Sequence, residues 1–353
     1  MKELAFIAML ALCCHGGASA GVREDERIVF FPTYAFQTKA GWMLNVHGWV
    51  YEPEERPVLG VMLRRAIPID RDKLTSAERL VYRERTRYFL PDNERGKLIA
   101  VQAGALRRTA PPTQANGHFK MSWQLSDAQF DAFGITNGMI SVAALLDAND
   151  ARAFTGAIHV LSNRGISVVS DIDDTIKVSE VRDQEALLLN TFCRPFKSAP
   201  RMAKLYAGWQ AQGAQFHYVS ASPWQLYPAL AEFVRTEGFP PGTFHMKALR
   251  LKDSTFLALF NDPIAYKLAV LEPLIAAFPD RKFVLAGDSG EKDPEIYAKL
   301  AERFPTRIEA VLIRNVTGET RQASRYRAVF RRIPSEKWHV FTEPSEIPRL
   351  TLK

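Results

Sequence analysis

The sequence predicts two domains, a mostly β domain followed by an α/β domain built on a parallel sheet. The chain has 353 residues, which is more than one hydrophobic core usually serves. The pattern of apolar and polar residues changes near residue 163. Before that point, short apolar segments alternate with turn residues; after it, apolar strands alternate with helices of ten or more residues, a pattern typical of parallel sheets. With 47% hydrophobic and 24% charged residues, the composition is that of an ordinary globular protein.

The first half, residues 21–163, is expected to form a sandwich-like or barrel-like β domain. Turn pairs such as Asn116-Gly117 and Asn137-Gly138 separate its apolar segments. Several short strands at this spacing favour a sandwich or a barrel. The predicted strands are Arg27–Phe31, Trp42–Tyr51, Val58–Leu63, Lys97–Val101, Phe119–Leu125 and Ile140–Leu146.

A helical insertion interrupts these strands. Thr75 and Glu78 have the spacing of a capping box, and a helix can run from there to Leu90, where Pro91 ends it. Four of its residues make it basic: Arg79, Arg83, Arg85 and Arg87. We expect a solvated helix face, and contact with an anionic membrane is the alternative.

The second half, residues 164–333, is predicted to be the α/β domain, and residues 334–353 a C-terminal extension. The predicted strands are Ile166–Val169, Gln215–Val219, Phe244–Leu249, Lys282–Ala286 and Ile308–Ile313. The predicted helices are Met202–Gln212, Trp224–Glu237, Ile264–Phe278 and Pro294–Arg303.

Residues 1–20 are expected to be a secretory signal peptide rather than part of the fold. Lys2 precedes an apolar run of eleven residues, Leu4–Cys14, and Ala18-Ser19-Ala20 is a small-residue cleavage pattern. The run is too short to span a bilayer, which takes about 20 apolar residues. We therefore expect an exported protein, periplasmic or secreted, with peripheral membrane contact possible. An acylated Cys13 or Cys14 is the less favoured, lipoprotein alternative.

Charge and cysteine usage add two expectations. The formal charge is +7 and the pI about 9.3, so anionic partners such as phospholipid surfaces, nucleic acid or cell-wall polymers are attracted. No basic run of the kind that binds nucleic acid is present, and we expect no nucleic-acid partner. Without the signal peptide the chain keeps only Cys193, which follows the apolar run Leu187–Leu189 and is expected to be buried.

The first chemical signal is Asp171-Ile-Asp173-Asp174-Thr175, directly after a predicted strand. In an extended chain, two carboxylates two residues apart point the same way. Asp171 can attack phosphorus and form an aspartyl-phosphate, while Asp173 protonates the leaving oxygen and later activates water. An acidic turn or an incomplete calcium loop is the alternative interpretation.

Two further signals are a serine and a lysine. Ser220 follows a strand, where its hydroxyl can donate to a phosphoryl oxygen; Ser222 competes for this role or caps the next helix. Lys267 lies early in a helix and can neutralise phosphate charge and hold Asp171. Lys247 and Lys252 are competing candidates for that role.

The fourth signal is the segment Gly287–Asp293, which also follows a strand. Asp288 and Asp293 can hold a divalent cation, one of them directly and the other through water. Oxygen ligands around a phosphate suit Mg²⁺. Asp293 also precedes Pro294 and has the sequence signature of a helix N-cap. Because ligands bind beyond the carboxyl ends of parallel strands, all four signals can converge on one pocket.

The four signals follow strands in a fixed order along the chain. Their residues and their order resemble the motifs of the haloacid dehalogenase superfamily of phosphotransferases. The resemblance implies an α/β haloacid dehalogenase-like fold. It also implies that Asp171 is nucleophile and metal ligand, and that Asp173 is acid and base and binds the metal through its carbonyl oxygen.

The same resemblance assigns the remaining motif residues. It implies that Thr175 and Ser220 bind the substrate phosphate and that Lys267 is both catalytic and phosphate-binding. Asp288 and Asp293 then bind the metal.

One branch of the superfamily is closer still. Three segments are similar to sequence motifs of the actin-patch-associated phosphatidate phosphatase family, with lipins as more distant relatives: Ser170–Lys177, Tyr218–Pro223 and Gly287–Tyr297. The similarity covers roughly residues 164–320. It implies Mg²⁺-dependent hydrolysis of phosphatidate to diacylglycerol and phosphate. The alternatives are a phosphatase for another exported phosphomonoester, and a non-catalytic module that binds anionic lipid.

The spacing of the motifs bears on the substrate. Only about 45 residues separate the first motif from Ser220, so no large cap domain fits there. An open site suits a bulky or surface-presented substrate. The segment Ile176–Ala199 mixes apolar and basic residues and is expected to pack on its own domain, with membrane contact as the alternative. Trp224 is expected either to line the pocket mouth or to pack, and His217 to be a core residue.

Overall fold

The computed structural model describes residues 21–53, 57–249 and 263–350. The predicted signal peptide, with Cys13 and Cys14, and the competing Lys252 lie outside these residues. Within the described part of the chain, no helix combines the length and apolarity that a membrane span requires.

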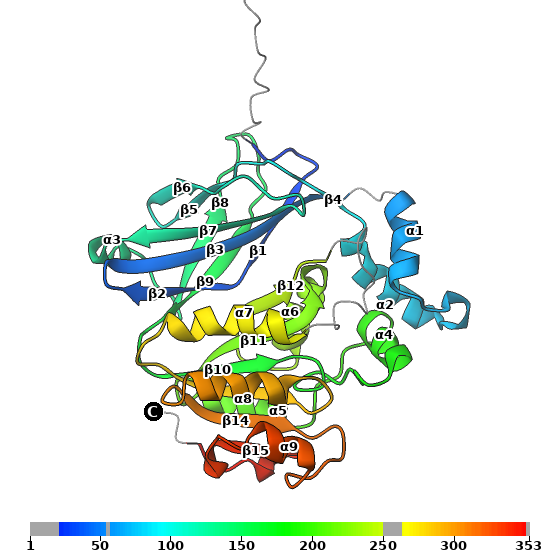
Figure 1. Ribbon diagram of the computed structural model, residues 1–353. Coiled ribbons are helices and arrows are strands. Elements are labelled where there is room, and N and C mark those ends of the chain that lie inside the picture. Colours follow the sequence, from blue (N-terminus) through cyan, green and yellow to red (C-terminus); the bar gives the residue numbers. More distant parts are fainter. Residues whose placement is uncertain (1–20, 54–56, 250–262, 351–353) are drawn as a thin grey trace, which may run out of the picture.

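The strands of the first half form one continuous sheet that curls around a common core (Figure 1). Its main path runs β1-β3-β2-β9-β8-β5-β6, and β4 and β7 pair with β3. Every pairing is antiparallel except that of β2 with β9. The strands are β1 (Arg27–Phe31), β2 (Thr33–Thr38), β3 (Gly41–Glu52), β4 (Asp92–Asn93), β5 (Ala100–Ala103), β6 (Leu106–Thr109), β7 (His118–Leu125), β8 (Met139–Ala144) and β9 (Thr155–Leu161).

Four of the predicted strands in this half appear as β1, β3, β7 and β8, and the fifth is shifted to β5. The strand predicted at Val58–Leu63 is wrong, because these residues lie in helix α1 (Pro57–Ala66). A short apolar run does not by itself separate strand from helix, and Pro57 at the first helical position favours the helix. Strands β2, β6 and β9 are additional; β6 is largely exposed and β9 begins with small residues, so neither shows clear alternation.

The predicted capping box is confirmed at the start of helix α2 (Ser76–Thr86), where the Thr75 side chain accepts from the Glu78 N–H. The helix ends at Thr86 rather than Leu90, and a 3₁₀ turn, η2 (Arg87–Phe89), follows it. A second 3₁₀ turn, η1 (Arg71–Lys73), precedes it, and α3 (Asp127–Asp131) follows β7.

The second half is a parallel sheet of order β12-β11-β10-β13-β14-β15. The strands are β10 (Ile166–Asp171), β11 (Gln215–Pro223), β12 (Gly242–Lys247), β13 (Lys282–Asp288), β14 (Ile308–Arg314) and β15 (Trp338–Phe341). The predicted α/β alternation is therefore present. Residues predicted as a C-terminal extension contribute β15, which pairs with β14.

Helices cover both faces of this sheet (Figure 1). On one face α5 and α6 pack with Val168, and on the other α7, α8 and α9 pack with Val169. Successive residues of β10 thus enter two separate cores, which explains why this strand is apolar throughout. The helices are α4 (Gln184–Phe192), α5 (Met202–Gln210), α6 (Tyr227–Thr236), α7 (Pro263–Ala276), α8 (Asp293–Arg303) and α9 (Ser324–Val329), with 3₁₀ turns η3 (Trp224–Leu226), η5 (Ser335–Lys337) and η6 (Pro344–Glu346).

The two halves share an aromatic contact. The ring of Phe31, at the end of β1, lies 4.1 Å from the ring of Trp224 between centroids, and His47 also contacts Trp224. Trp224 is buried and packs between the sheets, where it also lines a groove of about 280 Å³ together with His47 and His245. The first sheet therefore rests against the segment that follows β11.

Candidate active site

The structure brings the motif residues to one edge of the parallel sheet. Strand β10 lies between β11 and β13, and all three carry polar residues at or near their carboxyl ends. Asp171 ends β10, Ser220 lies near the end of β11, and Asp288 ends β13. Lys267 comes from α7 and Asp293 from the first turn of α8. All of these side chains are buried.

Asp171 is held by a lysine and a hydroxyl. Lys267 Nζ lies 2.8 Å from Asp171 Oδ1, and Thr175 Oγ1 donates to Asp171 Oδ2 at 3.2 Å. Burial raises the pKa of Asp171 well above its usual value, and the ammonium of Lys267 opposes that rise. Lys267 is fully buried, so the solvated position that isolated lysines usually occupy is excluded.

Lys267 is surrounded by carboxylates. Besides Asp171, its ammonium hydrogen-bonds Asp293 and lies 3.4 Å from Glu291 Oε2. Burial alone would lower the pKa of Lys267, but the three carboxylates together hold it well above its usual value. Lys267 is therefore a permanent positive charge at the bottom of the site.

The carboxylates here have the chemistry of a divalent-cation site. Ligand oxygens of Asp171, Glu291 and Asp293 lie within 4.8 Å of one another. Asp288 Oδ1 accepts from the N–H groups of Gly290 and Glu291, while its buried Oδ2 has no hydrogen-bond partner. The converging oxygens of Asp171, Glu291 and Asp293 suit a hard cation such as Mg²⁺, and Asp288, outside that group, offers an unpaired buried oxygen.

Two local features fix this acidic cluster. A Cβ at Gly287 would lie 2.3 Å from Asp293 Oδ2, so only glycine allows Asp293 to approach the strand end. Helix α8 begins at Asp293, its N-cap is Lys292, and no side chain caps it. The N-cap expectation for Asp293 is therefore wrong: its carboxylate accepts instead from the Asp288 N–H and from Lys267.

Asp173 has a different set of partners. Lys177 Nζ lies 2.8 Å from its Oδ1, Ser179 donates to Oδ1 at 2.7 Å, and Ser220 donates to Oδ2 at 3.0 Å. Burial alone would raise the pKa of Asp173, but Lys177 and these hydrogen bonds hold it below its usual value. The surroundings of the two aspartates of the motif thus shift their pKa values in opposite directions, upward for Asp171 and downward for Asp173.

Ser222 also donates to Asp173 Oδ2, at 3.2 Å, and its N–H donates to Ser220 Oγ at 2.9 Å. The expectation that it caps a helix is wrong, because Pro223 is the N-cap of the following 3₁₀ turn. Both serines thus lie beside Asp173 at the end of β11.

Asp174 shapes the turn that follows the motif. It adopts a left-handed backbone, with φ of 53°. Its carboxylate accepts from the backbone N–H groups of Ser179, Glu180 and Val181 at 2.7–2.9 Å. Asp and Asn tolerate this conformation better than most residues. This structural role explains the third acidic residue of the motif.

Sequence reasoning missed three polar residues of the site: Lys177, Ser179 and Glu291. Two of them lie inside the segments that carry the family resemblance: Lys177 ends Ser170–Lys177, and Glu291 lies within Gly287–Tyr297. Their proximity to Asp171 and Asp173 depends on the turns after β10 and β13, which the spacing of the motifs does not define.

The other candidates have structural positions. Lys247 ends β12, with its ammonium 5.3 Å from the ring centroid of Tyr266. His217 is buried as expected, between the hydroxyls of Ser167 and Thr243. Cys193 is also buried as expected, and burial raises the pKa of its thiol to about 11.

The basic helix is only partly solvated. Arg79 and Arg83 are exposed, but Arg85 is buried and donates to the carbonyl oxygens of Thr191 at 2.6 Å and Asn190 at 3.3 Å. The expectation of a solvated face is therefore wrong for Arg85. The same contact joins α2 to α4, so the segment Ile176–Ala199 packs on its own chain.

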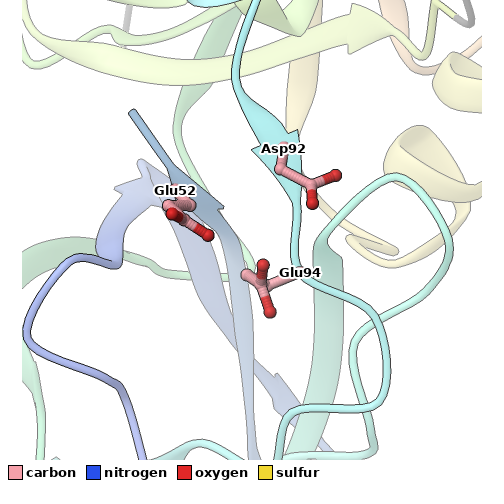
Figure 2. A group of neighbouring side chains, drawn as sticks. All are labelled: Glu52, Asp92 and Glu94. Atoms are coloured by element: carbon pink, nitrogen blue, oxygen red, sulfur yellow. The ribbon is translucent and has the colours of Figure 1, made fainter. Parts of the chain in front are cut away.

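A second carboxylate group lies on the first sheet, where β4 pairs with the end of β3 (Figure 2). Glu52, Asp92 and Glu94 have oxygens within 4.8 Å of one another and are half-buried. Glu94 also pairs with Lys97, at 3.4 Å. This group belongs to different elements from the strand ends that carry Asp171 and Asp288.

The parallel sheet and its buried carboxylate–lysine cluster define an α/β domain with a candidate active site. Residues 166–315 match the profile of a family described as "Phosphatidate phosphatase APP1, catalytic domain". The chain is therefore similar to that family over 150 of its 353 residues. The match begins with β10 and extends one residue beyond β14, so it contains every motif residue described above.

Two curated proteins are similar to the chain. A Schizosaccharomyces pombe protein described as uncharacterized is 30% identical over 222 residues, which are 59% of this chain and 34% of that protein. Phosphatidate phosphatase APP1 of Saccharomyces cerevisiae is 33% identical over 162 residues, 44% of this chain and 27% of that protein. The chain thus spans about a third of the length of these relatives.

Proposed function

We propose that the chain is a Mg²⁺-dependent phosphatidate phosphatase of haloacid dehalogenase type. It hydrolyses phosphatidate to diacylglycerol and phosphate through an aspartyl-phosphate on Asp171. The observation that carries this proposal is the contrast between the two aspartates: Asp171 lies against Lys267 among carboxylates, whereas Asp173 lies against Lys177, Ser179 and Ser220. Two carboxylates in different environments are what a nucleophile and an acid require.

In the first step, an oxygen of Asp171 attacks phosphorus and the bond from phosphorus to the glycerol oxygen breaks. Asp173 donates its proton to that departing oxygen, so diacylglycerol leaves as a neutral alcohol. Lys267 stabilises the charge on the transferring group. Because Asp173 is held below its usual pKa without substrate, the negative charge of a bound phosphate would favour its protonated form.

In the second step, Asp173 accepts a proton from water, and the resulting hydroxide attacks phosphorus. The bond from phosphorus to Asp171 breaks and inorganic phosphate leaves. Both aspartates return to their starting states. The hydroxyl of Thr175 donates to Asp171 and that of Ser220 donates to Asp173. Both hydroxyls can turn to donate to phosphoryl oxygens during the cycle.

Mg²⁺ fits the acidic cluster, with Asp171, Asp288 and Asp293 as its side-chain ligands and the carbonyl oxygen of Asp173 as a further one. Glu291 is an additional candidate ligand, because its carboxylate lies in the same group. When bound, Mg²⁺ would supply positive charge to the phosphoryl oxygens.

The substrate comes from the printed name of the family and of the yeast relative. The formal net charge of +7 and the absence of a large inserted domain between the described strands agree with a substrate held at an anionic membrane surface. The leader-like pattern of residues 1–20 supports an exported enzyme, periplasmic or secreted, with peripheral membrane contact.

The test is phosphate release from phosphatidate in mixed micelles, with Mg²⁺ and with EDTA. Asp171→Asn keeps the shape of the side chain but removes the nucleophilic carboxylate. We expect release that depends on Mg²⁺ and falls by roughly a thousandfold or more in the variant. Ser162→Ala, outside the site, is the matched control and should retain activity.

The alternatives predict other outcomes. Release from a generic aryl phosphate but not from phosphatidate would keep the chemistry and overturn the lipid substrate. Tight binding to anionic vesicles, with no turnover of either compound in the presence of Mg²⁺, would favour a lipid-binding module.

A further inference from the structure

A surface groove of about 490 Å³ lies between helix α2 and helix α6. Ligand pockets usually measure roughly 300–1,000 Å³. Tyr88 and Phe196 line it, together with Gln225, Ala229 and Phe233. Three separate parts of the chain therefore build it: the helical insertion of the first half, the segment after α4, and the helix after β11.

The groove shares a wall with the candidate active site. Phe196 lines the groove, and its ring centroid lies 5.0 Å from Lys177 Nζ. The same ammonium lies 2.8 Å from Asp173. On the opposite side, Gln225 lines the groove and follows closely after Ser220 and Ser222, whose hydroxyls donate to Asp173.

The position of the groove matches the direction in which the alcohol leaves. In the proposed reaction Asp173 protonates the departing oxygen, so the alcohol must lie on the Asp173 side of the phosphoryl group. Lys267 and the acidic cluster contact Asp171, whereas the residue that links the groove to the site, Lys177, contacts Asp173. By contrast, another groove, of about 370 Å³, includes Ile308 at the start of β14, so it opens near the amino end of that strand, away from the site.

The chemistry of the walls suits a neutral ligand with polar groups. Arg85 and Arg87 are offset by Glu84, Glu232 and Glu237 within the same groove. With three carboxylates against two guanidinium groups, the groove does not attract a second anion. Apolar side chains, among them Phe196 and Phe233, lie beside these polar groups, so the walls can contact both the ester groups and the acyl chain of a neutral ligand.

We propose that this groove, here called the α2–α6 groove, binds the diacylglycerol part of the lipid substrate, next to the ester bond that breaks. The proposal rests on the proposed function and names a subsite for it. The groove takes the glycerol with its ester groups and the first part of an acyl chain. The helical insertion of the first half thus contributes to substrate selection.

The test fills the α2–α6 groove without touching the catalytic residues. Ala229 is half-buried on α6, and Ala229→Trp places an indole in the groove. We expect kcat/KM for dioctanoyl phosphatidate to fall by roughly tenfold or more, while kcat/KM for p-nitrophenyl phosphate changes by less than about twofold. Ala207→Trp, at an exposed position of α5, makes the same change outside the groove and should affect neither substrate.

Chain length gives a second readout. In the wild type, kcat/KM should rise from dibutyryl to dioctanoyl phosphatidate, and this rise should be smaller in Ala229→Trp. Ala229→Leu, a smaller change, should give the same pattern to a lesser degree and serves if the Trp variant does not fold. An unchanged chain-length dependence in a folded variant, or an equal loss on both substrates, would overturn the subsite.

The two proposals fail in different ways. A wild type that releases no phosphate from either lipid refutes the proposed substrate, and the subsite with it. If the wild type is active on lipid and the folded Ala229 variants have the same kcat/KM values as the wild type, only the subsite is refuted.

Discussion

At the scale of single residues, the site depends on charges that compensate one another in a buried place. Lys267 is fully buried and neutralises part of a cluster that contains Asp171, Asp293 and Glu291. Removing one partner of a buried ion pair is costly because the other charge stays buried and uncompensated. Lys267 therefore affects both the chemistry and the stability of the domain.

Replacing Lys267 with Met should lower the free energy of unfolding at pH 7 by about 3–5 kcal/mol. Burial already raises the pKa of Asp171, and without Lys267 that rise has no opposing charge. A raised carboxyl pKa means that the folded state takes up protons before the unfolded state does. The deficit should therefore shrink as the pH falls from 7 towards 4.

Urea denaturation of Lys267→Met at several pH values checks this prediction. Lys204→Met is the matched control, since Lys204 is exposed on α5 and its loss should leave the free energy of unfolding nearly unchanged. A deficit of equal size at pH 4 and pH 7 would show that lost packing, rather than the buried charges, causes the instability.

At the scale of elements, helix α2 contacts the second half through Arg85, which is buried, and through the partly exposed pair of Glu78 with Arg194. The guanidinium of Arg85 donates to the Thr191 carbonyl at the end of α4 and lies 3.5 Å from the ring centroid of Phe196. A buried guanidinium with carbonyl partners is a specific connection, whereas an exposed arginine contributes little. The basic helix thus supports the segment that carries Phe196 beside Lys177.

Arg85→Met should reduce the free energy of unfolding by about 1.5–3 kcal/mol, the usual contribution of hydrogen bonds that involve a charged group. Arg83→Met, at an exposed position of the same helix, should change it by less than about 0.5 kcal/mol. Chemical denaturation of both variants separates the two cases. Equal effects would mean that helix propensity or net charge, and not the contact with α4, is responsible.

At the scale of the whole molecule, the two sheets meet through aromatic and imidazole rings. His47 on β3 and His118 on β7 share a hydrogen bond of 2.9 Å, and both rings lie against Phe31. Burial lowers the pKa of His118 to about 3 and that of His47 well below its usual value. Both imidazoles are therefore neutral in the folded state at physiological pH.

This contact predicts loss of stability in acid. A histidine whose folded pKa is lowered stabilises the fold above its unfolded pKa, about 6.5, and that contribution is lost as the pH falls, because the unfolded state binds protons that the folded state does not. By pH 5 each such group should cost up to about 2 kcal/mol. Tm should accordingly fall between pH 7 and pH 5.

His118→Gln keeps a polar side chain but removes one titrating group. The fall in Tm from pH 7 to pH 5 should be smaller in this variant than in the wild type. The other buried histidines are present in both proteins, so the difference isolates His118. Parallel Tm curves for the two proteins would contradict the assignment.

The four motif signals and most elements of the second half, β10 to β14 and α5 to α8, could be predicted from the sequence, whereas α4, α9 and β15 were not. Strands that are buried on both faces consist of continuous apolar residues, so they can be located in the sequence together with the polar residues that follow them. The first half was less predictable: the apolar segment at Val58–Leu63 forms helix α1, and strands β2, β6 and β9 carry weak patterns. Short segments take their structure from neighbours that are distant in the sequence.

By itself the sequence determined which residues form the motif signals behind the proposed chemistry: Asp171 and Asp173 after a strand, a lysine on a helix, and an acidic segment after a later strand. These are local facts of residue type and order. Only the tertiary structure decided which lysine faces which aspartate, that Ser222 and Lys177 join Asp173, and that helix α2 forms a groove beside the site. The reason is physical: a side chain's charge is set by its own atoms, whereas its partners are set by turns and packing that bring separate segments together.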